Sequence, residues 1–291
     1  MNDFQNSSKV FSFTLFADDS SVFFSHNDPN VLLETVNTEL NHVEEWICAN
    51  KLSLNLNKTQ SMLFSNSISQ LPGNICINET VISLVDSFKF LGLTIDNKLS
   101  WKEHNLHLSK TLSRNVGIIN KLKMSFPKYI LKTLYSTLIL PYLNYGVLAW
   151  GNSYNYQLDK LLILQKRVMR IICHTDRLSH TNCLFFENKI LKIHDLYNFF
   201  LGCFMFQLNL NELPHAITSL FQTNQQLHNY PTRQSSFFHL YRLRTVLRKK
   251  TLIFTGPVFW NSLDLTLKQL PTLSIFKHHL KEKLLLQYKE T

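Results

Sequence analysis

The stretch Thr14–Phe24, TLFADDSSVFF, places two adjacent carboxylates, Asp18 and Asp19, between runs of apolar and β-branched residues. The flanking residues predict two short strands, over 10–16 and 20–25, joined by a turn at the two acids. Two neighbouring carboxylates repel each other, and burying either without a cation costs free energy. Because aspartate is also a common turn residue, this stretch alone is consistent with both a polar hairpin turn and a metal-binding turn.

The composition is that of a globular chain with an uneven charge. Of the 291 residues 45% are hydrophobic, with only 7 Gly and 8 Pro, which excludes disordered and fibrous classes. Residues 1–100 carry five Lys and eleven Asp or Glu, a net charge of −6, whereas residues 101–291 carry 25 basic and 9 acidic residues, a net charge of +16. The second part is therefore expected to bind a polyanion, although a solvated basic surface gives the same composition.

The cysteines and the apolar segments indicate an intracellular chain without a membrane partner. The five Cys show no metal-ligand spacing, which is typical of free thiols. The N-terminus lacks the pattern of a signal peptide, and the most apolar segment, 196–208, is too short to span a bilayer. We therefore expect a cytoplasmic or nuclear location, or both.

The spacing of apolar residues predicts an α+β fold. After Asp28-Pro29, apolar residues recur at three- and four-residue steps, which predicts an amphipathic helix over 29–49. Further short strands are expected over 61–64, 75–77, 80–85 and 88–95. After Trp101 the period becomes helical, and helices are expected over 102–124, 127–142, 155–173, 182–188, 192–209 and 272–288. Residues 210–250 show no clear period.

Several blocks in a consistent order carry a resemblance to a known family. Phe16-Ala17-Asp18-Asp19 is similar to the F/Y-A-D-D motif of the reverse transcriptases of jockey-like non-LTR retrotransposons. The L-N-x-x-K-T block and the primer-grip segment of that family are matched by Leu54–Thr59 and Phe90-Leu91-Gly92, and Leu143–Trp150 and Gly256–Leu263 resemble later blocks. Ordered blocks are far more specific than a single short motif.

The resemblance implies a fold and a set of roles. It implies a partial polymerase palm of hairpin, helix and short strands (residues 1–100), an all-α thumb-like region (101–210) and a C-terminal basic helical region (211–291). It implies that Asp18 and Asp19 bind Mg²⁺, with Lys58 near the leaving pyrophosphate as a general acid or electrostatic stabiliser. Phe90, Leu91 and Gly92 would help to hold the primer 3′ end.

The chain departs from the family at its beginning. In the family a further palm aspartate and the fingers precede the F-A-D-D hairpin, and here only about fifteen residues do so. Asp3 lies in an expected polar loop entry, where we expect it to be exposed. The expectation is therefore a truncated reverse transcriptase that binds Mg²⁺ weakly and does not polymerise on its own.

Basic residues on the predicted helices favour nucleic-acid binding. They recur on one side of two successive amphipathic helices and again near Tyr241, where rings accompany the charge. The candidates are Lys110, Arg114, Lys121, Arg167, Arg170, Arg242, Arg244 and Arg248. The expected partners are an RNA template and an RNA–DNA or DNA duplex. Two alternatives stay open: a non-enzymatic helical interaction protein derived from a mobile element, and a reading frame that is a decayed element copy or a gene-model fragment. The oligomeric state has no signal in the sequence.

Overall fold

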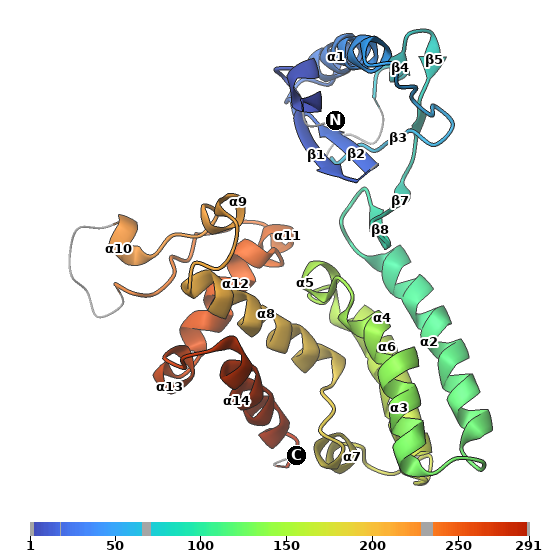
Figure 1. The fold of residues 1–291 in the computed structure, drawn as a ribbon, viewed down its shortest axis with the longest axis vertical. Helices are drawn as coiled ribbons and strands as arrows, with labels where there is room; N and C mark the ends of the chain where they lie inside the picture. The colour runs from blue at the N-terminus through green and yellow to red at the C-terminus, as the bar shows by residue number, and fades with distance from the viewer. Residues whose placement is uncertain (1–2, 18, 66–70, 228–234, 290–291) are drawn as a thin grey trace. The chain divides into compact units, whose positions relative to one another are not determined.

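The computed structural model describes residues 3–17, 19–65, 71–227 and 235–289 (Figure 1). The chain divides into two compact units, Met1–Leu99 and Ser100–Thr291. The first unit combines one long helix with short strands, whereas the second is built of helices. This mixture confirms the expected α+β class, while the palm and thumb assignments stay predictions.

The first unit begins with an antiparallel hairpin. A 3₁₀ helix, η1 (Phe4–Ser7), precedes strands β1 (Ser12–Phe16) and β2 (Asp19–Phe23). Helix α1 (Pro29–Ala49) follows, and the side chain of Asp28 caps it by accepting a hydrogen bond from Asn30 N at 2.8 Å. The predicted strand–strand–helix order of this region is confirmed.

The first unit has a small core. Helix α1 packs against η1 and against β4 (Cys76–Ile77), so its apolar stripe faces inward. The buried residues of this core are Phe4, Phe11, Leu40, Val43, Ile47, Ile77 and Ile82.

The remaining described strands of the first unit pair two by two: β3 (Gln60–Ser61) with β6 (Ser83–Leu84), β4 with β5 (Thr80–Val81), and β7 (Ser87–Phe90) with β8 (Leu93–Asp96). Within the described residues, no sheet of this unit has more than two strands.

The second unit begins with helices that pack side by side. Figure 1 shows α2 (Lys102–Leu122), α3 (Lys128–Leu138) and α6 (Asn155–Ile172) in contact with one another. The single helix predicted over 127–142 is wrong, because α3 ends at Leu138 and a separate helix, α4 (Leu140–Asn144), follows. Pro141 accounts for the break, since it has no N–H with which to continue the helical hydrogen bonds of α3.

The rest of the second unit surrounds one apolar helix. Short helices α5 (Val147–Trp150) and α7 (Asn182–Glu187) lead to α8 (Ile193–Asn209), which packs against α12 (Leu252–Ser262) and α14 (Leu273–Leu286). The other helices are single turns: α9 (His215–Thr218), α10 (Asn224–Leu227), α11 (Val246–Lys249) and α13 (Leu265–Lys268).

Helix α12 was not predicted, because it contains Gly256 and Pro257, two residues of low helix propensity. A methyl group on Gly256 would lie 2.6 Å from Met205 Sδ, so glycine permits this close packing on α8.

A buried glutamine joins three segments of the second unit. Gln165, on α6, is 1% exposed, and its Nε2 donates hydrogen bonds to Tyr135 Oη at 3.0 Å and to Leu191 O at 3.2 Å. Its Oε1 accepts a hydrogen bond from Ile193 N at 2.8 Å. Burial raises the pKa of Tyr135 to about 12, so this hydroxyl stays neutral at physiological pH. One side chain thus links α6 to α3 and to the start of α8.

Tyr288, in the segment after α14, is bound to the start of α8. The hydroxyl of Tyr288 accepts a hydrogen bond from Lys192 N at 3.0 Å and donates one to Asp195. The ammonium of Lys192 lies 4.0 Å from the centre of the Tyr288 ring, a cation–π contact. Burial raises the pKa of Asp195 and lowers that of Lys192. The segment after α14 is therefore fixed to the start of α8.

We expect Gln165→Leu to lower the free energy of unfolding by about 3 kcal/mol. The change leaves the buried Leu191 O and Ile193 N without their amide partner, and an unpaired buried polar group costs about 1–3 kcal/mol. Urea unfolding followed by circular dichroism measures the loss. The control is Ile163→Ala on the same helix, where the side chain is 63% exposed and the expected change is within about 0.5 kcal/mol. Equal losses in the two variants would contradict the role of Gln165.

Candidate catalytic hairpin and nucleic-acid interface

The tip of the first hairpin presents a carboxylate to solvent. Phe16 pairs with Asp19 in the β1–β2 register, so the connection between the two strands is tight and begins at Ala17. Ala17 has φ 52°, in the left-handed region that side-chain-bearing residues rarely adopt. Asp19 is exposed, whereas Asp18 lies outside the described residues. The tight turn therefore holds Asp19 at the first position of β2, with its side chain accessible.

Lys58 belongs to a separate turn in the same unit. Its backbone N–H donates to Asn55 O at 3.0 Å, and Thr59 Oγ1 donates to the same carbonyl at 3.0 Å, so Asn55 organises the L-N-x-x-K-T block. The side chain of Lys58 is exposed. In the described part of the chain, neither Asp19 nor Lys58 takes part in an ion pair. Both charges are thus accessible to ligands, and no ion pair joins them.

The chemistry of Asp19 suits magnesium. Mg²⁺ prefers oxygen ligands and is commonly bound through one or two carboxylates together with water and substrate phosphates. An exposed carboxylate without a cationic partner meets that requirement for one ligand. Asp3, the other acid near the start of the chain, is exposed, as expected. The described part of the hairpin therefore offers one carboxylate, which is fewer ligands than a magnesium ion requires.

The primer-grip segment lies at the tip of a second hairpin. Phe90 pairs with Leu93 in the β7–β8 register, and Leu91 and Gly92 form the two-residue turn. Both turn residues have positive φ, 45° and 82°, as the tight hairpin turns with this twist require. The Phe88 and Phe90 rings lie 6.0 Å apart. Phe90 and Leu91 are half-buried and Gly92 is exposed, so the backbone of this turn is accessible.

The basic residues predicted on α2 and α6 are mostly on the surface. Both helices bury their apolar faces, which include Leu112 on α2 and Leu161 on α6. The exposed basic residues are Lys110, Arg114, Lys121 and Arg167. Arg170 differs because it is half-buried and its Nε donates to Ser179 O at 2.9 Å. Its guanidinium is thus partly committed to the loop that follows α6.

The third basic cluster lies around α11. Arg242, Arg244 and Arg248 are exposed, and residues 213–263 contain no Asp or Glu. The first two arginines precede the helix, and Arg248 lies within it, beside Lys249 and Lys250. Positive charge without acidic neighbours in the sequence favours binding to phosphate groups.

The structure adds two tyrosines that the sequence did not single out. Tyr154 and Tyr156, at the start of α6, have ring centres 6.0 Å apart and are inclined by 26°. Lys250 lies with its Nζ 4.2 Å from the centre of the Tyr154 ring. A contact between residues almost a hundred positions apart leaves no local pattern, so periodicity could not reveal it. The alternation of the two tyrosines with polar residues was the only signal available.

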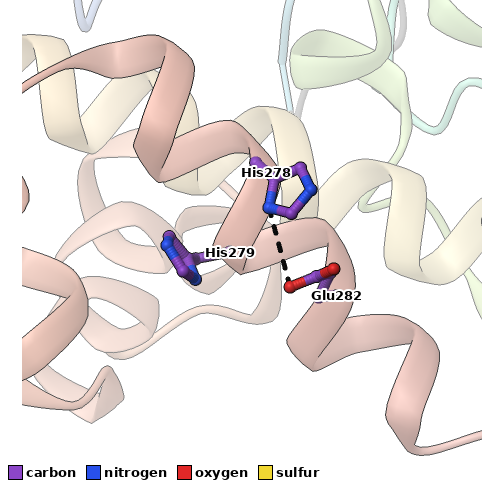
Figure 2. Close-up of side chains that lie close together, drawn as sticks. All are labelled: His278, His279 and Glu282. Atoms are coloured by element: carbon purple, nitrogen blue, oxygen red, sulfur yellow. Dashed lines mark ion pairs between the residues drawn. The ribbon is translucent and has the colours of Figure 1, made fainter.

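A cluster of possible metal ligands lies on α14 in the second unit. His278, His279 and Glu282 place one ligand atom each within 4.8 Å of one another, and all three are exposed (Figure 2). His278 Nδ1 lies 3.6 Å from Glu282 Oε2, an ion pair between successive turns when the imidazole is protonated. This cluster does not include the predicted ligands Asp18 and Asp19, which belong to the first unit.

Comparison with curated proteins finds relatives that are all named as RNA-directed DNA polymerases or probable ones. Over 183 residues, 62% of this chain, it is 25% identical to the RNA-directed DNA polymerase from mobile element jockey of Drosophila funebris. It is 23% identical over 199 residues to the jockey polymerase of Drosophila melanogaster and 20% identical over 188 residues to a probable RNA-directed DNA polymerase from transposon X-element of that fly. The chain resembles the reverse transcriptases of jockey-type non-LTR elements. The predicted resemblance is confirmed.

The likeness to the jockey-type reverse transcriptases covers only part of those proteins. The matched region spans about a fifth of the length of these relatives. No family model and no solved structure matches the chain. Across the described segments, none of the helices combines the length and apolar character needed to cross a bilayer.

Proposed function

We propose that this chain is the part of a retrotransposon reverse transcriptase that contains the polymerase hairpin and the helices that follow it, and that it binds RNA or an RNA–DNA duplex. The likeness to the jockey-type polymerases carries the proposal. The net charge of +16 over residues 101–291 supports it, as do the exposed basic residues of α2, α6 and α11. In this proposal residues 1–100 are palm, 101–210 are thumb-like and 211–291 are a C-terminal helical region, and the protein acts inside the cell.

Roles for individual residues follow from the matched blocks. Asp18 and Asp19 would hold Mg²⁺, and Lys58 would lie near the departing pyrophosphate. The metal, when bound, stabilises the charge that develops on the transferring phosphate. The backbone of Leu91 and Gly92 would contact the primer 3′ end, since the second hairpin leaves this turn accessible. These roles rest on the resemblance together with the exposure of Asp19, Lys58 and Gly92.

We further propose that the 291-residue polypeptide does not polymerise by itself. Its predicted metal ligands are two neighbouring residues of one turn, and magnesium bound there would lack further carboxylate ligands. The resemblance implies another palm aspartate from an earlier strand. In this proposal the site is completed only by carboxylates in addition to Asp18 and Asp19.

Binding to an RNA–DNA hybrid should weaken steeply as salt rises. Contacts with phosphates release counterions, so log Kd should rise linearly with log salt, with a slope set by the number of phosphates neutralised. Fluorescence anisotropy of a labelled hybrid measures the slope. Arg114→Gln and Lys110→Gln should each reduce it by about 1, whereas Lys9→Gln, an exposed change in the first unit, should not. A flat salt response would favour the non-enzymatic interaction protein over this proposal.

Primer extension tests the proposed inactivity. With an oligo(dT) primer on a poly(rA) template and Mg²⁺ or Mn²⁺, the 291-residue polypeptide should incorporate no nucleotide, because its metal site is incomplete. A complete reverse transcriptase in the same buffer is the positive control. Incorporation that disappears in Asp18→Ala would refute the proposal, since it would show that the hairpin acids suffice.

A further inference from the structure

Two exposed tyrosines form a rigid aromatic surface at the start of α6. Tyr154 is 42% exposed and Tyr156 is 59% exposed, and their nearly parallel rings lie 6.0 Å apart between centres. We call this pair the tyrosine platform. Tyr156 Oη accepts a hydrogen bond from Nε2 of the buried Gln157 at 3.0 Å. The Oε1 of the same glutamine accepts a hydrogen bond from Asn105 Nδ2 at 2.9 Å, which connects the platform to α2. The rings are thus held by the fold rather than free in solvent.

Lys250, almost a hundred residues later in the sequence, contacts the other tyrosine. Its Nζ lies 4.2 Å from the centre of the Tyr154 ring and donates a hydrogen bond to Asn152 O at 3.0 Å. In return Asn152 Nδ2 donates to Lys250 O at 3.1 Å, so the two residues are joined twice. Burial lowers the pKa of Lys250 from its ordinary value. Because Lys250 covers part of Tyr154, Tyr156 offers the larger free ring surface.

Positive charge accompanies the platform. Arg248 and Lys249 are exposed on α11, directly before Lys250, and no acidic residue occurs between positions 213 and 263. The carboxylate nearest to the platform along α6 is Asp159, which lies 3.4 Å from His194 Nε2. Aromatic rings beside basic side chains are the combination that binds unpaired nucleotides, since bases stack on the rings and phosphates pair with the cations.

We propose that Tyr154 and Tyr156 are a stacking site for a base of single-stranded nucleic acid, with Arg248 and Lys249 binding its phosphates. The inference rests on the proposed function. It adds to that function a named binding site and the requirement that the bound nucleic acid be single-stranded. Bases within a duplex already stack on one another, so only an unpaired base can lie on the ring of Tyr156. The same chemistry serves RNA and DNA, and the two are separated by using both in the test.

The test compares leucine and phenylalanine at the two tyrosines. Anisotropy with short labelled oligo(U), oligo(dT) and an RNA–DNA hybrid reports Kd for each variant of the full 291-residue chain. Tyr156→Leu and Tyr154→Leu should each raise Kd for single strands about tenfold, since a stacked base contributes about that much. Tyr156→Phe and Tyr154→Phe keep the rings and should bind within about twofold of the unaltered chain. If affinity falls equally for oligo(U) and oligo(dT), the site recognises the base and phosphate that RNA and DNA share. If affinity falls only for oligo(U), the site is specific for RNA.

Further measurements show whether a change in Kd comes from lost stacking, from unfolding or from lost charge. Tyr129→Leu removes a tyrosine that is 70% exposed on α3, outside the platform, and should leave Kd unchanged. Thermal unfolding by circular dichroism shows whether each leucine variant is folded. The salt slope should stay the same in the leucine variants, because they remove no charge, and should fall by about 1 in Lys249→Gln.

The outcomes distinguish the platform from the proposed function. Leucine variants that bind single strands as the unaltered chain does, while salt-dependent binding persists, would refute the platform alone. Equal weakening for single strands and the hybrid would refute the preference for unpaired bases. Absence of binding to all three probes by the unaltered chain would overturn the proposed function together with the platform.

Discussion

The buried amide of Gln165 fixes the helical unit at the point where three of its segments meet. Its hydrogen bonds hold α6 against Tyr135 of α3 and against the backbone that begins α8. Because α2 packs on both α3 and α6, the basic faces of α2 and α6 depend on this arrangement. The start of α8 is held a second time by Tyr288, near the end of the chain. Polar contacts in the core therefore set the positions of the helices, while the charged residues stay outside and available to a polyanion.

The two units divide the proposed function between them. The first presents two tight hairpin turns, and their accessible elements, the Asp19 side chain and the backbone at Gly92, are those that the resemblance assigns to metal and primer. Its described sheets have two strands each, so its order depends on a few aromatic and aliphatic residues such as Phe4 and Ile47. The second unit carries the net positive charge and a large apolar core. Carboxylates attract metal and basic helices attract phosphate, so the Asp19 side chain and the basic residues of the second unit have the charges that their proposed ligands require.

The sequence predicted regular elements well where the hydrophobic period was long. Helices α1, α2, α6 and α8 were located within about two residues, the usual uncertainty of helix ends. The prediction failed at Pro141, where one expected helix is two, and at α12, whose Gly256 and Pro257 lower local helix propensity while packing on α8 stabilises the helix. For the site, the residue pattern predicted the first hairpin, whereas the segment expected as one strand over 88–95 is the second hairpin, β7–β8. The pattern could not predict the tyrosine platform, because the contact between Tyr154 and Lys250 depends on tertiary packing.

Photo-cross-linking shows whether the helical unit of this chain binds nucleic acid through its basic surface. The full 291-residue chain is irradiated with a photoreactive RNA–DNA hybrid that carries a single-stranded overhang, and the linked peptides are identified by mass spectrometry. We expect links to peptides from α2, from the start of α6 and from residues 241–250, and we expect these links to be lost at high salt. Links that avoid all three segments, or that persist unchanged in high salt, would contradict it.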